Sequence, residues 1–140
     1  MLAMVEQLNM IPPPMIEQLI PIFFSHDSQI HQPHLVAHLC ESLAGFSGER
    51  AISLVNMGRC IFGREDNLAQ LGKLTMPVLT MTGEFDVPRP PHEAQQMAEL
   101  IPNGHYEVIP RAGHITALEQ PEAVNRQLIA FLSQPTKLRA

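Results

Sequence analysis

The chain has 140 residues, of which 45% are apolar and 16% are charged, and its formal net charge is −5. This length and apolar content fit one domain of ordinary size with a packed core, and they argue against a chain that is mostly disordered. The nine Lys and Arg residues form no clustered basic patch, so the composition argues against a nucleic-acid surface. The first ten residues include Glu6 and have no basic segment before their apolar residues, so we predict a cytoplasmic protein without a signal peptide or membrane anchor.

Three helices are predicted in the first half of the chain. After the prolines at positions 12–14, apolar residues recur at helical spacing and form one stripe: Ile16, Leu19, Ile20, Phe23 and Phe24. A second helix is predicted after Pro33 and should end at Gly45, because glycine commonly follows the last residue of a helix. A third is predicted from about Gly48 to Phe62, and its apolar residues lie around several sides, which indicates burial on more than one side.

Cysteines and histidines in these helices raise the question of a metal site. Cys40 and Cys60 lie on predicted apolar helix faces without C-x-x-C spacing, which favours buried free thiols over a disulfide or metal ligands. His34 and His38 have the i, i+4 spacing that metal sites use, and His31 lies close by, but no H-E-x-x-H motif or carboxylate partner accompanies them. We therefore predict no bound metal, and nothing else in the sequence implies a cofactor.

The second half of the chain alternates strand and helix patterns. The predicted order is strand, helix, strand, helix, at Pro77–Thr82, Pro91–Ile101, Tyr106–Ile109 and Pro121–Leu132. This order predicts an α/β fold with parallel strands, and the near-continuous apolar runs indicate strands buried on both faces. The polar stretch Arg64–Thr75 is the best boundary, so we divide the chain into regions 1–71 and 72–140, as two subregions and not as independent domains.

Asp86 and His114 each follow one of the two predicted strands. Ligands and catalytic groups of parallel sheets collect beyond the carboxyl ends of the strands, so the two side chains should meet there. A carboxylate bonded to one imidazole nitrogen leaves the other nitrogen free to act as a base. Gly83 and Gly113 should permit the tight turns between each strand and its functional residue. Taken singly, Asp86 could be a turn acid and His114 a partly buried histidine bonded to a carbonyl group.

Pro77–Leu132 resembles the C-terminal part of the α/β-hydrolase family, including its lactonase, esterase and C–C-bond hydrolase branches. The turn Gly83-Glu84-Phe85-Asp86 is similar to the family's G-x-x-D acid turn, Gly113-His114 is similar to its histidine turn, and LEQPEAVNRQLIAFL resembles its last helix. The resemblance implies that Asp86 is the triad acid and His114 the general base. Residues from about Pro12 to Leu71 resemble, more weakly, the helical cap that such enzymes insert before these strands.

The chain departs from the family pattern at the nucleophile. The family carries it on a G-x-S-x-G turn upstream of the cap, and this sequence has no such turn. The nearest match, around Ser47, follows a predicted helix and lacks the second glycine spacing, so Ser47 is better interpreted as a turn residue or helix N-cap. The predicted fold is thus a partial α/β-hydrolase core, two parallel strands with flanking helices, preceded by a helical cap region and lacking the nucleophile-bearing half.

Two functional interpretations follow from these observations. In the first, the chain is a hydrolase-family protein that retains Asp86 and His114 and whose intact relatives act on a small apolar ester or lactone. The alternative is a non-catalytic binding or assembly module derived from a truncated hydrolase. Glu84, next to the acid turn, is expected to be solvated. In either case one edge of the strand Pro77–Thr82 would be bare, which predicts a homo-oligomer, most simply a twofold dimer.

Overall fold

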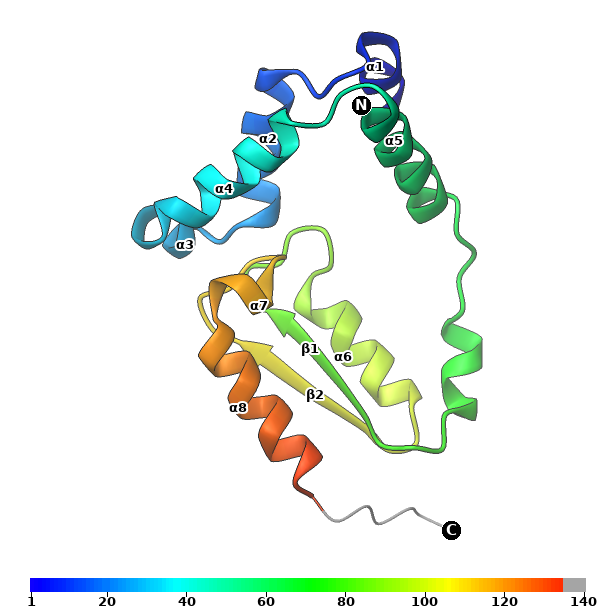
Figure 1. Cartoon of the computed structure of the whole chain (residues 1–140). Helices are drawn as coiled ribbons and strands as arrows, with labels where there is room; N and C mark the ends of the chain where they lie inside the picture. The colour runs from blue at the N-terminus through cyan, green and yellow to red at the C-terminus, as the bar shows by residue number, and fades with distance from the viewer. Residues whose placement is uncertain (135–140) are drawn as a thin grey trace. The chain divides into compact units, whose positions relative to one another are not determined.

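The computed structural model describes residues 1–134, which form two compact units (Figure 1). The helical unit comprises Met1–Ile20 and Pro33–Asp66, and the strand unit comprises Pro21–Gln32 and the described residues from Asn67 onward. Each unit has its own cluster of buried apolar residues. The segment Pro21–Gln32 groups with the strands although it lies early in the sequence, so the two units do not correspond to a single cut in the chain. The division into 1–71 and 72–140 remains a prediction.

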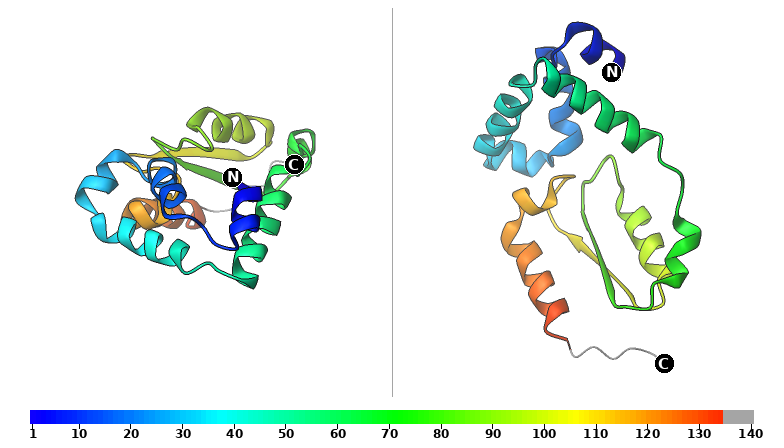
Figure 2. Two further views of the ribbon diagram at one scale, coloured as in Figure 1. Left: turned by 90° about the horizontal axis from the view of Figure 1, so that it is seen from above. Right: turned by 45° about the vertical axis from the view of Figure 1, so that its right-hand side comes forward.

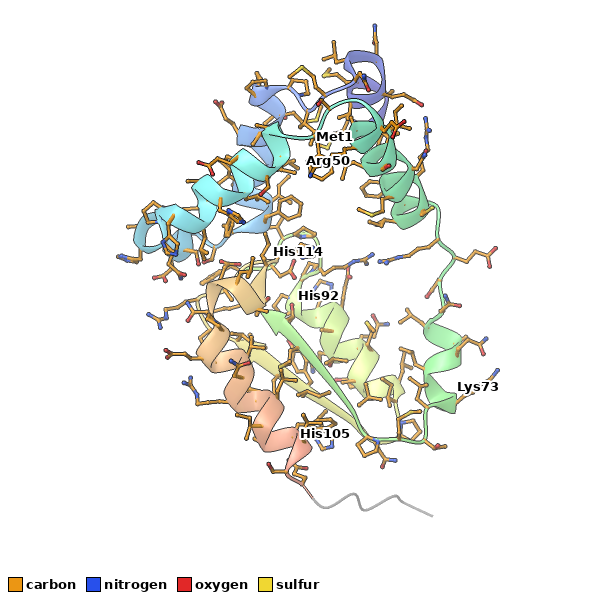
Figure 3. All side chains as sticks on the ribbon, in the orientation of Figure 1. Met1, Arg50, Lys73, His92, His105 and His114 are labelled. Atoms are coloured by element: carbon orange, nitrogen blue, oxygen red, sulfur yellow. The ribbon has the colours of Figure 1, made fainter. Side chains whose placement is uncertain are left out.

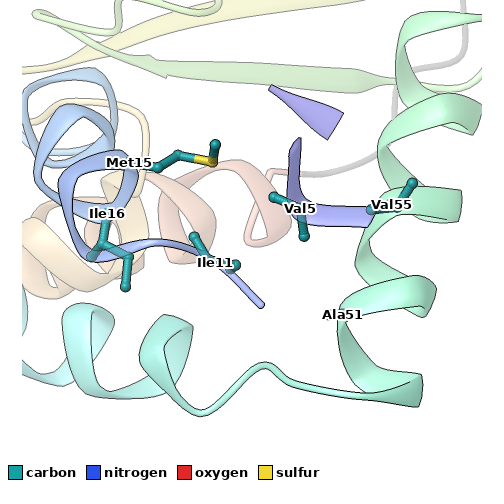
Figure 4. Close-up of a cluster of buried hydrophobic side chains, with 6 residues drawn as sticks. All are labelled: Val5, Ile11, Met15, Ile16, Ala51 and Val55. Atoms are coloured by element: carbon teal, nitrogen blue, oxygen red, sulfur yellow. The ribbon is translucent and has the colours of Figure 1, made fainter. Parts of the chain in front are cut away.

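The helical unit is built from α1 (Leu2–Leu8), α2 (Pro13–Phe23), α4 (Pro33–Ala44) and α5 (Glu49–Phe62), with the last residues of α2 belonging to the strand unit. The three predicted helices are confirmed by α2, α4 and α5, whereas α1 is not among the predicted helices. Prolines begin α2 and α4, where their missing N–H group has no intrahelical partner to lose. The buried residues of this unit's core are shown in Figure 4: Val5, Ile11, Met15, Ile16, Ala51 and Val55.

Two predictions for the helical unit are wrong. Helix α5 buries only Ala51 and Val55 among its residues, and Phe62 at its end is 80% exposed, so its burial is one-sided within the described chain. The reason is that α5 packs on α1 along one face and its other apolar side chains find no covering element in the unit. The thiol of Cys60 is exposed, although it was expected to be buried, and Cys40 is half-buried against the core.

The strand unit contains two parallel strands, β1 (Val78–Gly83) and β2 (Gly104–Ile109), paired from Val78 with Gly104 to Gly83 with Ile109. Helix α6 (Pro91–Leu100) connects them and covers one face of the sheet, and α8 (Pro121–Leu132) lies on the other face (Figure 2). The predicted strand–helix–strand–helix order and the parallel pairing are confirmed. Pro91 and Pro121 begin the two helices, as expected for proline at a first helical position.

The strands are less covered than the sequence predicts. Of the six residues of β1, only Thr82 and Gly83 are buried, and the first four are half-buried. The expectation of burial on both faces along the whole strand is therefore wrong within the described residues. The sheet there has two strands, so coverage concentrates at the carboxyl ends. The remaining helical elements of this unit are η1 (Leu68–Lys73, a 3-10 helix), α3 (His26–His31) and α7 (Thr116–Glu119). Of these, α3 and α7 adjoin the carboxyl ends of the strands.

Candidate active site

Two turns leave the carboxyl ends of β1 and β2 at the same edge of the sheet. The turn after β1 is closed by a hydrogen bond from the Asp86 N–H to the Gly83 carbonyl, 3.2 Å. It is joined to the segment after β2 by the Glu84 N–H, which donates to Ile109, and the Phe85 N–H, which donates to the Ala112 carbonyl at 2.9 Å. The backbone thus fixes the acid turn against the residues that lead to the histidine.

The side chains of Asp86 and His114 form a hydrogen-bonded pair at this edge. The His114 Nδ1 atom lies 2.9 Å and 3.0 Å from the two Asp86 carboxylate oxygens, so the predicted contact is confirmed. Asp86 is only 8% exposed and also accepts the Arg89 N–H at 2.9 Å, which orients its carboxylate. Because an ionised carboxylate can only accept hydrogen bonds, Nδ1 carries the proton in this pair, and Nε2 of a neutral imidazole then has a free lone pair.

The imidazole of His114 is contacted on one side by an aromatic ring. The Phe23 ring stacks on it with the ring centroids 5.7 Å apart and 26° between the planes. The Phe23 carbonyl also accepts the N–H groups of His114 and Ile115, at 2.9 Å and 3.2 Å. The side chain of His114, which is labelled in Figure 3, is 34% exposed. Within residues 1–134 its ring is hydrogen-bonded only to Asp86.

Gly83 and Gly113 are required because side chains at these positions would prevent close packing. The sequence instead predicts that they permit tight turns. Among the glycines of residues 1–134, only Gly48 has a positive φ, so neither turn depends on glycine's left-handed conformation. A Cβ atom on Gly83 would lie 2.2 Å from the Gly113 carbonyl oxygen, and one on Gly113 would lie 2.6 Å from the Ser25 nitrogen. Both contacts are with backbone atoms, so the acid turn, the histidine and the segment at Ser25 approach one another only because these residues lack side chains.

A buried carboxylate behind His114 was not anticipated from the sequence. Glu119, the last residue of α7, is 2% exposed and accepts two backbone N–H groups, those of Gly113 and Ser25, both at 2.8 Å. The hydroxyl of Ser25 caps α3 by accepting the Ser28 N–H and donates to the Arg111 carbonyl at 2.7 Å. The segment from Phe23 to Ser25 is therefore fastened to the residues around His114 by several long-range contacts.

The remaining candidate residues do not join this site. Glu84 is exposed as expected, but its carboxylate also accepts the Arg111 N–H at 3.0 Å. Ser47 lies in a turn and pairs by its backbone with Met10, and the N-cap of α5 is Gly48 instead. His31 is 3.9 Å from Asp27, and within residues 1–134 no three metal-binding side chains are grouped.

Burial raises the pKa of Tyr106 above its ordinary value of 10.0, and its hydroxyl donates to the Pro91 carbonyl at 2.8 Å. This tyrosine joins β2 to the start of α6, and no hydrogen bond within residues 1–134 joins it to Asp86 or His114. It fixes the sheet against its covering helix.

Known proteins similar to this chain include esterases and a lactonase. A carboxylesterase of Bacillus subtilis, YbfK, is 41% identical over 71 residues, which cover 45% of this chain and 22% of the carboxylesterase. An esterase from Thermogutta terrifontis superposes with a TM-score of 0.76 at 28% identity, covering 91% of this chain and 46% of the esterase. An enol-lactonase from Burkholderia xenovorans shares the fold, with a TM-score of 0.77 at 18% identity, covering 95% of this chain and 48% of the lactonase. No protein-family model matches the chain.

The parallel strands, their covering helices and these superpositions define the chain as part of an α/β-hydrolase core accompanied by helices. The similar sequences and structures indicate an α/β-hydrolase family, and the chain corresponds to only part of its members. It spans less than a quarter of the length of the YbfK carboxylesterase and about half the length of the two solved structures. Among residues 1–134, no helix has the length and apolar character needed to cross a membrane.

Proposed function

We propose that Asp86 and His114 are the acid and the general base of a hydrolytic site for a small apolar ester or lactone, with the nucleophile supplied from outside residues 1–134. The observation that carries this proposal is the 2.9 Å contact between His114 Nδ1 and the Asp86 carboxylate at the ends of two parallel strands. It is supported by the esterase and lactonase names of the proteins that the chain resembles.

The pair can move a proton in the following way. The Nε2 lone pair of His114 takes the proton of a nucleophilic hydroxyl as that hydroxyl attacks the substrate carbonyl, and the imidazolium then returns a proton to the leaving group. Asp86 holds the ring in the required tautomer and stabilises its positive charge. Because Asp86 is itself held by the Arg89 N–H and is almost fully buried, its carboxylate needs little reorganisation during this transfer.

The hydroxyl groups of the residues around His114 form hydrogen bonds with groups other than its imidazole. Ser25 and Ser28 are buried and hydrogen-bonded to each other, and Ser25 also bonds to the Arg111 carbonyl. The Thr116 hydroxyl donates to the Gly113 carbonyl at 2.8 Å. None of them is bonded to the imidazole within the described residues, so we propose that another segment or another chain supplies the nucleophile.

The experiment is a complementation assay. The chain would be mixed with a separately expressed α/β-hydrolase segment that carries a G-x-S-x-G turn, and turnover of p-nitrophenyl esters and labelling by a serine-directed phosphonate would be measured. We expect negligible turnover by the chain alone and turnover by the mixture. His114→Ala should reduce the turnover of the mixture by at least about 1,000-fold, because the remaining groups give only residual catalysis. His105→Ala, at the opposite end of β2 (Figure 3), is the matched control and should leave it unchanged.

Two outcomes would contradict the proposal. Ester turnover by the purified chain alone that disappears in Ser47→Ala would show that the nucleophile lies within this chain. Silence of every mixture, with binding of the segment demonstrated, would favour the non-catalytic binding or assembly module.

For the chain by itself we also propose a twofold dimer formed through the open edge of β1. Val78 and Glu84 donate their N–H groups to carbonyls of the β2 side. Because alternate residues of a parallel strand bond to alternate sides, the N–H groups of Leu79 and Met81 point to the opposite edge. An apolar strand with such an edge is a template for pairing, and a twofold axis satisfies both copies at once.

The dimer is tested by light scattering across a dilution series. Leu79→Pro removes an N–H from the open edge and should yield monomer, whereas Leu79→Val keeps the N–H and should remain a dimer. A well-folded unmodified monomer at low micromolar concentration would contradict the proposal.

We further propose a cytoplasmic location, which the free thiols of Cys40 and Cys60 support because a reducing compartment maintains them. Fractionation of the cells that make the protein tests this.

A further inference from the structure

We propose that Glu119 is a positioning residue for His114, which holds the histidine's loop and the Phe23–Ser25 segment in one arrangement. The inference rests on the proposed role of His114 as the base. It starts from an unusual environment, since Glu119 is a carboxylate with 2% of its surface exposed. No Lys, Arg or His side chain forms an ion pair with it among the described residues.

The charge of Glu119 is satisfied by backbone groups of two separate segments. One oxygen accepts the N–H of Gly113, the residue directly before His114, and the other accepts the N–H of Ser25, both at 2.8 Å. A buried carboxylate without such partners would be strongly unfavourable, so it persists only while both segments stay in place. Glu119 therefore couples the backbone at His114 to the backbone at Ser25.

The other contacts of the two segments converge on the imidazole. From the Phe23–Ser25 side, the Phe23 carbonyl accepts the His114 N–H and the Phe23 ring stacks on the imidazole. Gln32, at the far end of α3, donates its side-chain amide to the Glu119 carbonyl at 3.0 Å. When the bond to Ser25 is lost, the Phe23 ring and carbonyl lose their support, and the His114 ring is no longer held against Asp86 from this side.

A glutamine cannot replace Glu119 in this role. Its side chain has the same shape but only one acceptor oxygen, and its NH₂ group would face one of the two backbone N–H groups. Glu84 provides a matched comparison, because its exposed carboxylate accepts the N–H of Arg111 in the same loop. A glutamine at position 84 can still accept that single bond through its oxygen.

The test follows the His114 ring directly in the full chain. Nitrogen-15 spectra of the imidazole report its tautomer, and the proton on Nδ1 gives a separate signal while it is bonded to Asp86. We expect Glu119→Gln to lose the Nδ1 proton signal and to shift the ring toward a mixture of tautomers, with the amide signals of β1 and β2 retained. Glu84→Gln should leave the His114 signals as in the unmodified chain. These measurements involve no turnover, so they succeed or fail independently of the complementation assay.

Unchanged His114 signals in a folded Glu119→Gln variant would overturn the inference. If that variant does not fold, Glu119→Asp is used, which keeps the charge but shortens the reach. Unchanged His114 signals there would also overturn it. If neither folds, amide exchange in the unmodified chain decides: protection of Gly113 and Ser25 as strong as that of His114 supports the coupling, and rapid exchange of either one refutes it.

Discussion

The helical unit and the strand unit are held by different kinds of contact. The helical unit depends on a small apolar core, and its side-chain bond between distant residues, from Arg59 to Glu6, is exposed. In the strand unit, buried or part-buried hydrogen bonds join residues far apart in sequence, including Ser25 with Glu119 and His114 with Asp86.

This difference explains why the candidate chemistry lies in the strand unit. Apolar contacts stabilise a helix pair but do not fix a side chain to a fraction of an ångström, whereas paired hydrogen bonds and close backbone contacts do. Catalytic pairs need that precision. The helical unit can therefore tolerate changes that the strand unit cannot.

The largest expected effect is that of Asp86→Asn on turnover in the complementation assay. The amide keeps the shape of the carboxylate but can turn its NH₂ toward His114, which favours the wrong tautomer of the imidazole. We expect turnover to fall by about 10⁴-fold with the strand unit still folded. The turnover rate and the nitrogen-15 spectrum of His114 are measured on the same variant. A fall of less than tenfold would show that the pair is structural only.

Next in size is the effect of Gly83→Ala on stability. The added Cβ would meet the Gly113 carbonyl oxygen, so the two turns must separate, and we expect the free energy of unfolding to fall by about 3 kcal/mol. Urea unfolding is followed by tyrosine fluorescence, which reports the strand unit alone because Tyr106 is the single tyrosine and there is no tryptophan. Gly72→Ala is the control, since its Cβ would find its nearest atom at 3.8 Å. Equal stabilities of the two variants would contradict the packing account.

The sequence predicts the parts of this site that depend on local patterns. The strands, α6 and α8 follow from apolar runs and helical periodicity. The meeting of Asp86 with His114 follows from the glycine turns and the strand-helix-strand spacing, together with the resemblance to the family. Glu119 was not predicted, because its partners include Ser25, and no local pattern connects residues so far apart. The one feature of the sequence that could have pointed to Glu119 is its position within the stretch that resembles the family's last helix.

Burial was the feature predicted least well, for a physical reason. Apolar residues on several sides of α5 predicted burial on more than one side, yet Phe62 and its neighbours are exposed. Hydrophobic periodicity reports which faces can be buried, but the covering partner is a property of the rest of the fold. The same reason applies to the first residues of β1, which have the composition of a central strand and a neighbour on one side only.

A smaller effect is expected for Val55→Ala in the helical unit. Val55 is fully buried, so the loss of two methyl groups should lower the free energy of unfolding of this unit by about 2 kcal/mol. The far-UV circular dichroism transition should shift to lower urea, while the Tyr106 fluorescence transition should stay in place. Phe62→Ala is the control and should shift neither. A common shift of both transitions would show that the two units unfold together. The units would then differ in their contacts but not in their stability.

The smallest effect is expected for Ser47→Ala. Ser47 is exposed, and its pairing with Met10 uses backbone groups, which alanine keeps. The free energy of unfolding should therefore change by less than about 0.5 kcal/mol. Turnover in the complementation assay should be unchanged as well, because a serine that follows a helix in the helical unit lacks the strand-to-helix turn that exposes a nucleophile. Loss of phosphonate labelling of the chain in this variant would contradict the expectation for turnover. It would move part of the chemistry into the helical unit, where the apolar core gives no comparable means of holding a reactive side chain in place.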